Sequence, residues 1–224
     1  MARSAGRGGA LMASSGRAAA AADKRRTILD AAIHVFARRG FHHCRVSDVA
    51  DEAGVAYGLV YHYFDSKEEI LNTLFLERWQ IMLDAIREID ERQDIPARDK
   101  LYLVASFIID SYQHEPELMK VIIVEVTRAA NSFGRLHLAK IREAYDSIEK
   151  IVDEARQEGS FKAQISSDFA ALCFYGAIEQ LLSGWIFDLI PATEEDFESA
   201  KWQVTEAICG GLQSPETNAP AVSG

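Results

Sequence analysis

The chain has 224 residues, which is enough for one large domain or two domains of modest size. Its hydrophobic share of 48% and its charged share of 26% are typical of a soluble globular protein. No uninterrupted apolar stretch is long enough for a membrane span, which argues against an integral membrane protein.

The formal net charge of −10 argues against a nucleic-acid partner until its distribution is considered. Residues 1–46 contain nine lysines and arginines against two aspartates, whereas the rest of the chain contains fifteen basic against thirty-two acidic residues. A basic N-terminal end on an acidic remainder would orient the protein on phosphates. A basic tail can also be merely solvated, so only Lys24 and its two arginine neighbours are favoured here as DNA contacts.

Three cysteines, Cys44, Cys173 and Cys209, lie far apart in the sequence. This odd, sparse set indicates a reducing, cytoplasmic environment and not a disulfide framework. The N-terminus also lacks the apolar segment of a secretory signal, so we expect a cytoplasmic protein.

The first 22 residues are rich in Ala, Gly, Ser and Arg without apolar periodicity, and they predict a disordered basic tail, although Ala18 to Ala22 could extend the helix that follows. From Asp23 to Arg39, apolar side chains recur at helical spacing, and Gly40 ends the pattern. Residues 213–224 predict a second disordered tail.

The segment Val46 to Asp65, VSDVADEAGVAYGLVYHYFD, predicts two short helices around a tight turn. Gly54 follows the first helix and can adopt the left-handed conformation that ends it. The second helix, from about Ala56 to Tyr63, directs Val60 and Phe64 inward and its small and aromatic polar residues outward. This arrangement is what a helix-turn-helix needs to enter a DNA major groove.

The chain resembles the TetR family of transcriptional regulators from "ILDAAIHVFARRGF" through "VSDVADEAGVAYGLVYHYFDSKEEIL". The resemblance covers residues 23–83, which we assign to the DNA-binding domain. It implies phosphate contacts by Tyr61 and Lys67. The residues expected to contact DNA are Lys24, Arg45, Ser47, Tyr57, Gly58, Tyr61, His62 and Lys67.

The family usually has Ser or Thr at the start of the first motif helix, where this chain has Cys44 and Arg45. The usual cap is therefore missing, and we expect Ser47 to substitute or the helix to start less firmly.

Residues 84–212 predict a helical ligand-binding and dimerisation domain. Together with the three-helix N-terminal domain it gives an all-α fold. We expect helices at residues 66–92, 96–114, 116–130, 136–158, 168–188 and 193–209.

The segment from Asp168 to Asp188 is apolar nearly all round, so a single chain offers too few partners to cover it. In the family such a helix and the one after it form a four-helix bundle across a two-fold axis, which implies a homodimer on a palindromic operator. Trp185 and Trp202 are either anchors of this interface or residues of the core.

The body also resembles TetR-type repressors of fatty-acid degradation, which respond to long-chain acyl-coenzyme A. The resemblance lies in "EVTRAAN" and "GSFKAQISSDFAALCFYGAIEQLLSGWIF". It implies a small apolar ligand, with Arg128 near the coenzyme A phosphates, although Arg128 could instead pair with Glu125 or Asp146. The candidate ligand contacts are Phe107, Glu125, Arg128, Asn131, Tyr175 and Glu179.

Two other functions were considered. An enzyme would need a nucleophile with a base, a phosphate-binding loop or a metal set, and the sequence has no such motif. We therefore expect no catalytic residue, metal or cofactor. A regulator that responds to drugs or xenobiotics, or one that senses oxidants through Cys173 or Cys209, remains an alternative to the acyl-CoA hypothesis.

Overall fold

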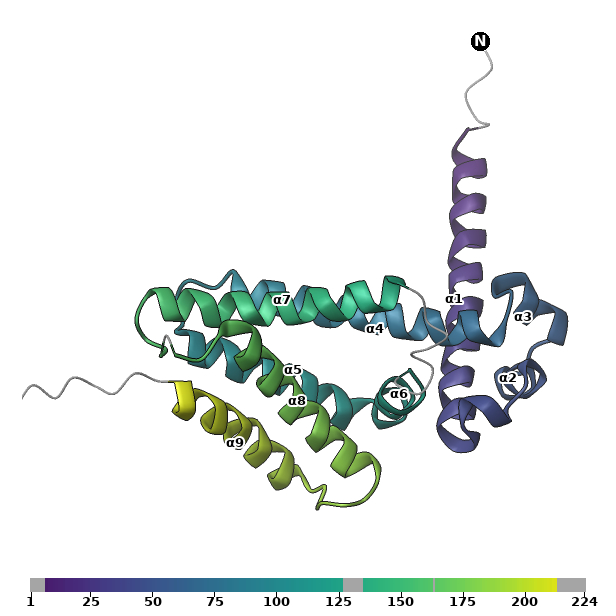
Figure 1. Cartoon of the computed structure of the whole chain (residues 1–224). Helices are drawn as coiled ribbons and strands as arrows, with labels where there is room; N and C mark the ends of the chain where they lie inside the picture. Colours follow the sequence, from purple (N-terminus) through teal and green to yellow (C-terminus); the bar gives the residue numbers. More distant parts are fainter. Residues whose placement is uncertain (1–6, 127–134, 163, 213–224) are drawn as a thin grey trace, which may run out of the picture. The chain divides into compact units, whose positions relative to one another are not determined.

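The computed structural model describes residues 7–126, 135–162 and 164–212 of the chain. Side chains are described for residues 19–124, 137–162 and 164–211. Within these ranges every regular element is helical and no strand occurs, as the all-α prediction requires (Figure 1). The chain forms two compact units that divide inside α4, between Phe75 and Leu76.

The first unit contains the predicted helix-turn-helix and is called the reader below. It contains α1 (Arg7–Arg39), the 3₁₀-helix η1 (Phe41–His43), α2 (Val46–Ala53), α3 (Tyr57–Tyr63) and the first part of α4 (Lys67–Asp90). The π-helix η2 (Val121–Val126) belongs to this unit and contacts α1.

The core of this unit follows the apolar spacing of the sequence. Ile28, Phe36, Val49, Val60 and Ile70 come from four different helices, and each is at most 1% exposed. Because burial of such a side chain is worth roughly 1.5–3 kcal/mol, these contacts hold the short helices α2 and α3 in place. Helices of eight and seven residues would not be stable alone.

The prediction of a disordered tail over residues 1–22 is wrong for residues 7–17, because α1 begins at Arg7. The alternative that Ala18 to Ala22 extends the next helix is confirmed. The physical reason is composition. The added segment is rich in alanine, which has the highest helix propensity, and it continues a helix that is already nucleated by the core.

The second unit is the body. It contains the rest of α4, followed by α5 (Ala97–His114), most of α6 (Pro116–Lys120), α7 (Arg135–Gln157), α8 (Ser167–Ile186) and α9 (Glu194–Leu212). Helix α7 packs on α8, α5 packs on α9, and α8 and α9 pack on each other. These helices begin and end within three residues of the predicted limits. The exception is the predicted helix 116–130, which becomes α6 followed by η2, and its last residues lie outside the described part.

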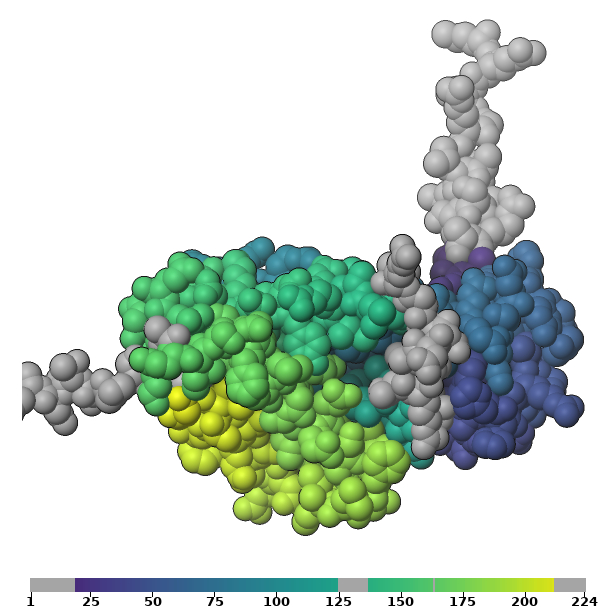
Figure 2. All heavy atoms as spheres, in the orientation of Figure 1, coloured from purple at the N-terminus to yellow at the C-terminus, as the bar shows by residue number. Residues whose placement is uncertain are grey.

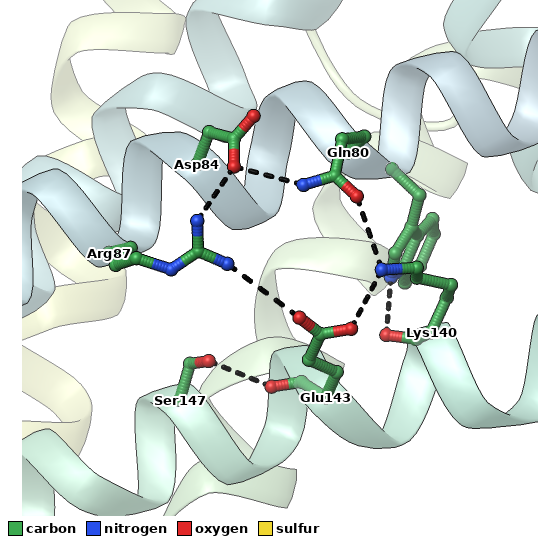
Figure 3. Close-up of polar contacts among 7 residues, drawn as sticks. Gln80, Asp84, Arg87, Lys140, Glu143 and Ser147 are labelled. Atoms are coloured by element: carbon green, nitrogen blue, oxygen red, sulfur yellow. Dashed lines mark hydrogen bonds and ion pairs between the residues drawn. The ribbon is translucent and has the colours of Figure 1, made fainter.

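A closed polar circuit joins α4 to α7 within the body (Figure 3). The amide of Gln80 donates to Asp84 (2.9 Å) and accepts from the ammonium of Lys140 (3.1 Å). Glu143 lies 2.9 Å from Lys140 and 3.7 Å from Arg87, and Arg87 returns to Asp84 at 2.9 Å. Beside the circuit, the indole of Trp79 donates to the carbonyl of Lys140 at 2.8 Å.

Glu179 interrupts the run of apolar residues in helix α8, but by length and average composition this helix could cross a membrane. Core helices of soluble proteins share this property. One side of α8 carries Phe174, Ile178, Leu182 and Trp185, all at most 3% exposed, so the helix already takes part in the core of the body.

Candidate DNA-reading surface and ligand pocket

The turn between α2 and α3 sets the direction of the reading helix. Gly54 has φ 63° and ψ 34°, the left-handed conformation predicted from the sequence, and its N–H bonds to carbonyls at the end of α2. A residue with a Cβ is strained at such a φ, so glycine suits this position. The chain can therefore reverse within three residues and start α3 at Tyr57.

Helix α3 has one buried face and one exposed face. Val60 and the following Phe64 are 0% and 3% exposed, whereas four of the predicted DNA contacts, Tyr57, Gly58, Tyr61 and His62, are exposed. The phenols of Tyr57 and Tyr61 lie 3.1 Å apart, and their rings meet edge to face at 5.0 Å. The hydrogen bond from Tyr57 raises the pKa of Tyr61. The two exposed hydroxyl groups can contact phosphate or base edges.

The missing cap of α2 is replaced in a way the sequence analysis did not predict. Asp48, in the first turn, accepts a hydrogen bond from the backbone N–H of Arg45 (2.7 Å) and another from the guanidinium of Arg39 (2.8 Å). The first of these bonds is the main cause that lowers the pKa of Asp48. The expectation that Ser47 substitutes for the cap is wrong, since Arg45 is the N-cap and Asp48 supplies the bond.

Lys67 has a structural role that the sequence did not reveal. Its ammonium donates to the carbonyls of Phe41 (2.7 Å) and Cys44 (3.1 Å) and lies 4.3 Å from the centre of the Phe41 ring. These bonds tie the start of α4 to the loop before α2. The predicted phosphate contact of Lys67 remains a prediction. Lys24 and Arg45 are exposed, and Ser47 is half-buried.

In the body, two of the predicted ligand contacts lie together. Tyr175 and Glu179 are one turn apart on α8, and the ring of Tyr175 lies 5.3 Å from that of Tyr145 on α7 and 6.3 Å from that of Trp79 on α4. The other predicted contacts are not joined to this group. Phe107 is half-buried on α5, the side chain of Glu125 lies outside the described residues, and so do Arg128 and Asn131.

Tyr145 and Trp79 were not among the predicted ligand contacts. The signal that could have found them is weak, because each is a single aromatic residue on a helix far from α8 in sequence. Their proximity to Tyr175 is a tertiary fact and not a local pattern.

A second hollow lies on the outside of the body, between α8 and α9. This groove has a volume of about 650 Å³ and is lined mainly by small and apolar side chains, including Ala177, Leu181, Leu189, Ile190 and Val204. The same two helices carry Phe169, Leu172 and Trp202, which do not line the groove and are 57%, 53% and 55% exposed. Trp185 is in contrast a core residue, packed against Tyr112 and Phe197. In the space-filling view, α8 and α9 form one continuous surface of the body (Figure 2).

Comparison with known proteins gives matches over most of the chain. Residues 28–74 match the family model described as bacterial regulatory proteins, tetR family, and residues 75–196 match the model described as YsiA-like protein, C-terminal region. The fatty acid metabolism regulator protein of Bacillus subtilis (strain 168) is 32% identical over 188 residues, which are 84% of this chain and 94% of that protein. The transcriptional regulator AcrR of Shigella flexneri is 24% identical over 88% of this chain and 96% of its own length.

Solved structures agree with these matches. The crystal structure of the regulator FadR from Bacillus subtilis, in complex with stearoyl-CoA, superposes with a TM-score of 0.71 at 27% identity, over 84% of this chain and 99% of that one. The MbdR regulator from Azoarcus sp. CIB superposes with a TM-score of 0.72 at 21% identity, over 85% of this chain and 100% of that one.

Proposed function

Since the chain belongs to the TetR family of ligand-responsive, DNA-binding transcriptional regulators, we propose that it is a repressor released from a palindromic operator by a long-chain acyl-CoA. We further propose that it binds DNA as a homodimer in the cytoplasm.

The exposure of one face of α3 supports the DNA-binding role most strongly. Its four predicted DNA contacts, Tyr57, Gly58, Tyr61 and His62, are exposed, while the opposite face packs into the core. A short helix with this polarity, after a tight glycine turn, fits a major groove.

The ligand is proposed from similarity and from chemistry. The Bacillus subtilis relative was crystallised with stearoyl-CoA, and this chain resembles it through both the reader and the body. An acyl chain needs an apolar interior, and coenzyme A phosphates need a cation. Arg128 is the residue we propose for that cation, and Phe107, Glu125 and Asn131 are proposed as further contacts.

The proposed dimer would use the outer face of α8 and α9. Three large apolar side chains of these helices, Phe169, Leu172 and Trp202, are exposed to solvent in the single chain. An apolar groove lies between the same two helices. Burying such a patch against a second copy is favourable. A two-fold dimer would also match a palindromic operator.

Release would pass through α4, which is one continuous helix with residues in both units. In the body it is tied to α7 by the circuit of Figure 3 and by Trp79, which also faces Tyr175. A ligand beside Trp79 would favour one position of α4. It acts only through a difference in its affinity for the DNA-bound and the released conformations.

A thiol sensor is the less favoured alternative. Burial raises the pKa of Cys209 to about 11, so its reactive thiolate would be rare at neutral pH. Cys44 is also buried and donates to the carbonyl of Phe41.

The test is a mobility-shift titration with DNA taken from beside the protein's own gene, with and without palmitoyl-CoA. Binding that palmitoyl-CoA abolishes supports both parts of the proposal. Binding that ignores every acyl-CoA but responds to a xenobiotic would reject the lipid ligand and keep the regulator. Arg128→Ala should keep DNA binding and weaken release, and an unchanged response would remove Arg128 from the pocket.

A further inference from the structure

The group formed by Trp79, Tyr145, Tyr175 and Glu179 is the strongest feature of the body that the proposed function leaves unexplained. Its members come from three helices, α4, α7 and α8. Tyr145 and Tyr175 meet edge to face at 70°, and Trp79 is inclined to Tyr175 by 57°. The three rings therefore form walls at steep angles to one another and not a flat stack.

Two members of this group, Tyr175 and Glu179, carry polar atoms without a partner among the described residues. Among the described residues, neither the carboxylate of Glu179 nor the phenol of Tyr175 takes part in a hydrogen bond or ion pair. Both side chains are nevertheless half-buried. Burial raises the pKa of Glu179, and burial followed by the nearby charge of Glu179 raises the pKa of Tyr145 and of Tyr175.

Tyr175 is half-buried beside the rings of Trp79, at 6.3 Å, and Tyr145, at 5.3 Å, and part of its side chain remains accessible. A ligand group that contacts Tyr175 would therefore occupy a space beside these rings and the carboxylate of Glu179.

A plain hydrocarbon chain would fill such a space badly. It would remove water from a carboxyl group and a phenol without replacing the hydrogen bonds, at a cost of about 1–3 kcal/mol for each group. A hydroxyl group on the chain would restore them, because it can donate to Glu179 and accept from Tyr175. Sites built to hydrogen-bond a hydroxyl group discriminate strongly against analogues that lack it.

We propose that Tyr175 and Glu179, walled by Trp79 and Tyr145, form a polar subsite that binds a hydroxyl group on the chain of the effector. The inference rests on the proposed function in that it takes the interior of the body as the ligand site. It narrows the ligand class from saturated acyl chains to oxygenated ones.

The test compares the binding of palmitoyl-CoA with that of palmitoyl-CoA hydroxylated at carbon 3, 12 or 16, by calorimetry on the full-length protein. We expect at least one hydroxylated ester to bind about tenfold or more tightly than palmitoyl-CoA. Tyr175→Phe and Glu179→Leu should each reduce this preference to about threefold or less, whereas Glu179→Gln, which keeps a hydrogen-bonding group, should retain most of it.

Tyr112→Phe is the matched control, because Tyr112 is a tyrosine of the same body that packs on Trp185 and Phe197 instead of on this group. It should leave the preference unchanged. Operator binding without ligand reports that each variant is folded. Equal affinities for all four esters, or a preference that survives both Tyr175→Phe and Glu179→Leu, would overturn the proposal.

If no CoA ester binds, the acyl-CoA part of the proposed function fails, and the subsite is tested with 1-octanol against 1-chlorooctane. Here the intrinsic fluorescence is the reporter, and Trp79→Phe identifies the part of the signal that comes from Trp79, whose ring faces Tyr175, and not from Trp185 or Trp202. Preference for the alcohol that is lost in Glu179→Leu supports the subsite independently of coenzyme A. Equal response to both compounds rejects it.

Discussion

Gly58 is the second residue of α3 and lies on its exposed face, where the fold itself does not require glycine. A Cβ built at this position meets no atom within 4 Å, in contrast to Gly54, whose positive φ demands glycine. Glycine in a helix costs about 1 kcal/mol relative to alanine. The helix therefore carries a residue that lowers its stability at the point where DNA would approach most closely.

We expect Gly58→Ala to raise the free energy of unfolding by about 0.5–1 kcal/mol and to weaken operator binding at least about tenfold. Urea denaturation and mobility shift measure the two effects on one protein sample. Gly176→Ala is the control for the change in stability alone, since this glycine is also helical with open space around its Cβ but lies on α8. Unchanged operator affinity for Gly58→Ala would remove close approach as the reason for glycine.

Lys67 can serve the fold and the DNA together. An ammonium group has three N–H donors, and the carbonyls of Phe41 and Cys44 accept from two directions. Lys67→Met should lower the free energy of unfolding by about 1.5–3 kcal/mol, because it removes charged donors from a half-buried site. If the third donor contacts a phosphate, the dependence of log K on log salt should also become less steep by about 0.9. A destabilised variant with an unchanged salt slope would assign Lys67 to the fold alone.

Asp48 gives the reader a pH-dependent contribution to stability. Its folded pKa lies below the ordinary value of 3.8, mainly because of the hydrogen bond from the backbone of Arg45. The contribution is therefore fully present above the unfolded pKa and is lost as the pH falls through the folded pKa. Asp48→Asn should be less stable than the wild type at pH 7 by roughly 0.5–1 kcal/mol, and the gap should narrow below about pH 4. Urea titrations across this range measure it, and a constant gap would contradict the assignment.

At the scale of elements, the reader could be predicted from sequence because its signals are local. The limits of α2 at Val46 and Ala53 and the left-handed Gly54 follow from apolar spacing and from one glycine. The cap by Asp48 and the anchoring of Lys67 could not be predicted in the same way. Both depend on residues that the fold brings together, such as Arg39 with Asp48 and Phe41 with Lys67.

In the body, too, some residues of the aromatic group could be predicted from local sequence and others could not. Tyr175 and Glu179 were predicted because polar groups within an apolar helix are conspicuous. Trp79 and Tyr145 were not, because only the packing of α4 and α7 beside α8 gives them a common role. The long α1 shows a different error. The composition of residues 7–17 is typical of a disordered tail, but these residues continue the helix.

The polar circuit between α4 and α7 makes a measurable contribution to the free energy of unfolding. Glu143 holds both Lys140 and Arg87, so Glu143→Gln weakens two of its ion pairs together (Figure 3). All three side chains are partly exposed, and we expect a loss of only about 0.5–1 kcal/mol, which should shrink in high salt. Urea denaturation at low and high salt measures this loss.

Asp146→Asn provides the comparison for the circuit, because the pair of Asp146 with Arg142 lies within α7 alone. It should cost less and leave the ligand response unchanged. Glu143→Gln should change the ligand concentration that releases half of the operator, if the position of α4 transmits the signal. A variant with normal release would show that the circuit stabilises the body without taking part in signalling.

At the scale of the whole molecule, two exposed features have to be reconciled with one function. The exposed side chains of α3 are polar, whereas α8 and α9 expose the large apolar side chains of Phe169, Leu172 and Trp202 and hold an apolar groove between them. A single reader contacts one half-site, and affinity for a palindrome requires two readers held at a fixed separation. An apolar face that would pair two copies supplies that requirement.

Leu172 lies on this face and is 53% exposed in the single chain. Leu172→Glu would place two carboxylates in the proposed interface without disturbing the core of either copy, so we expect monomers at concentrations where the wild type is dimeric. Ile81→Glu is the matched control, because Ile81 is a comparably exposed residue, at 51%, on α4. Sedimentation velocity should separate the two variants, and only Leu172→Glu should lose operator affinity while keeping weak binding to a single half-site. If Leu172→Glu remains dimeric, the interface must be sought on another face, since a carboxylate pair buried there would not be tolerated.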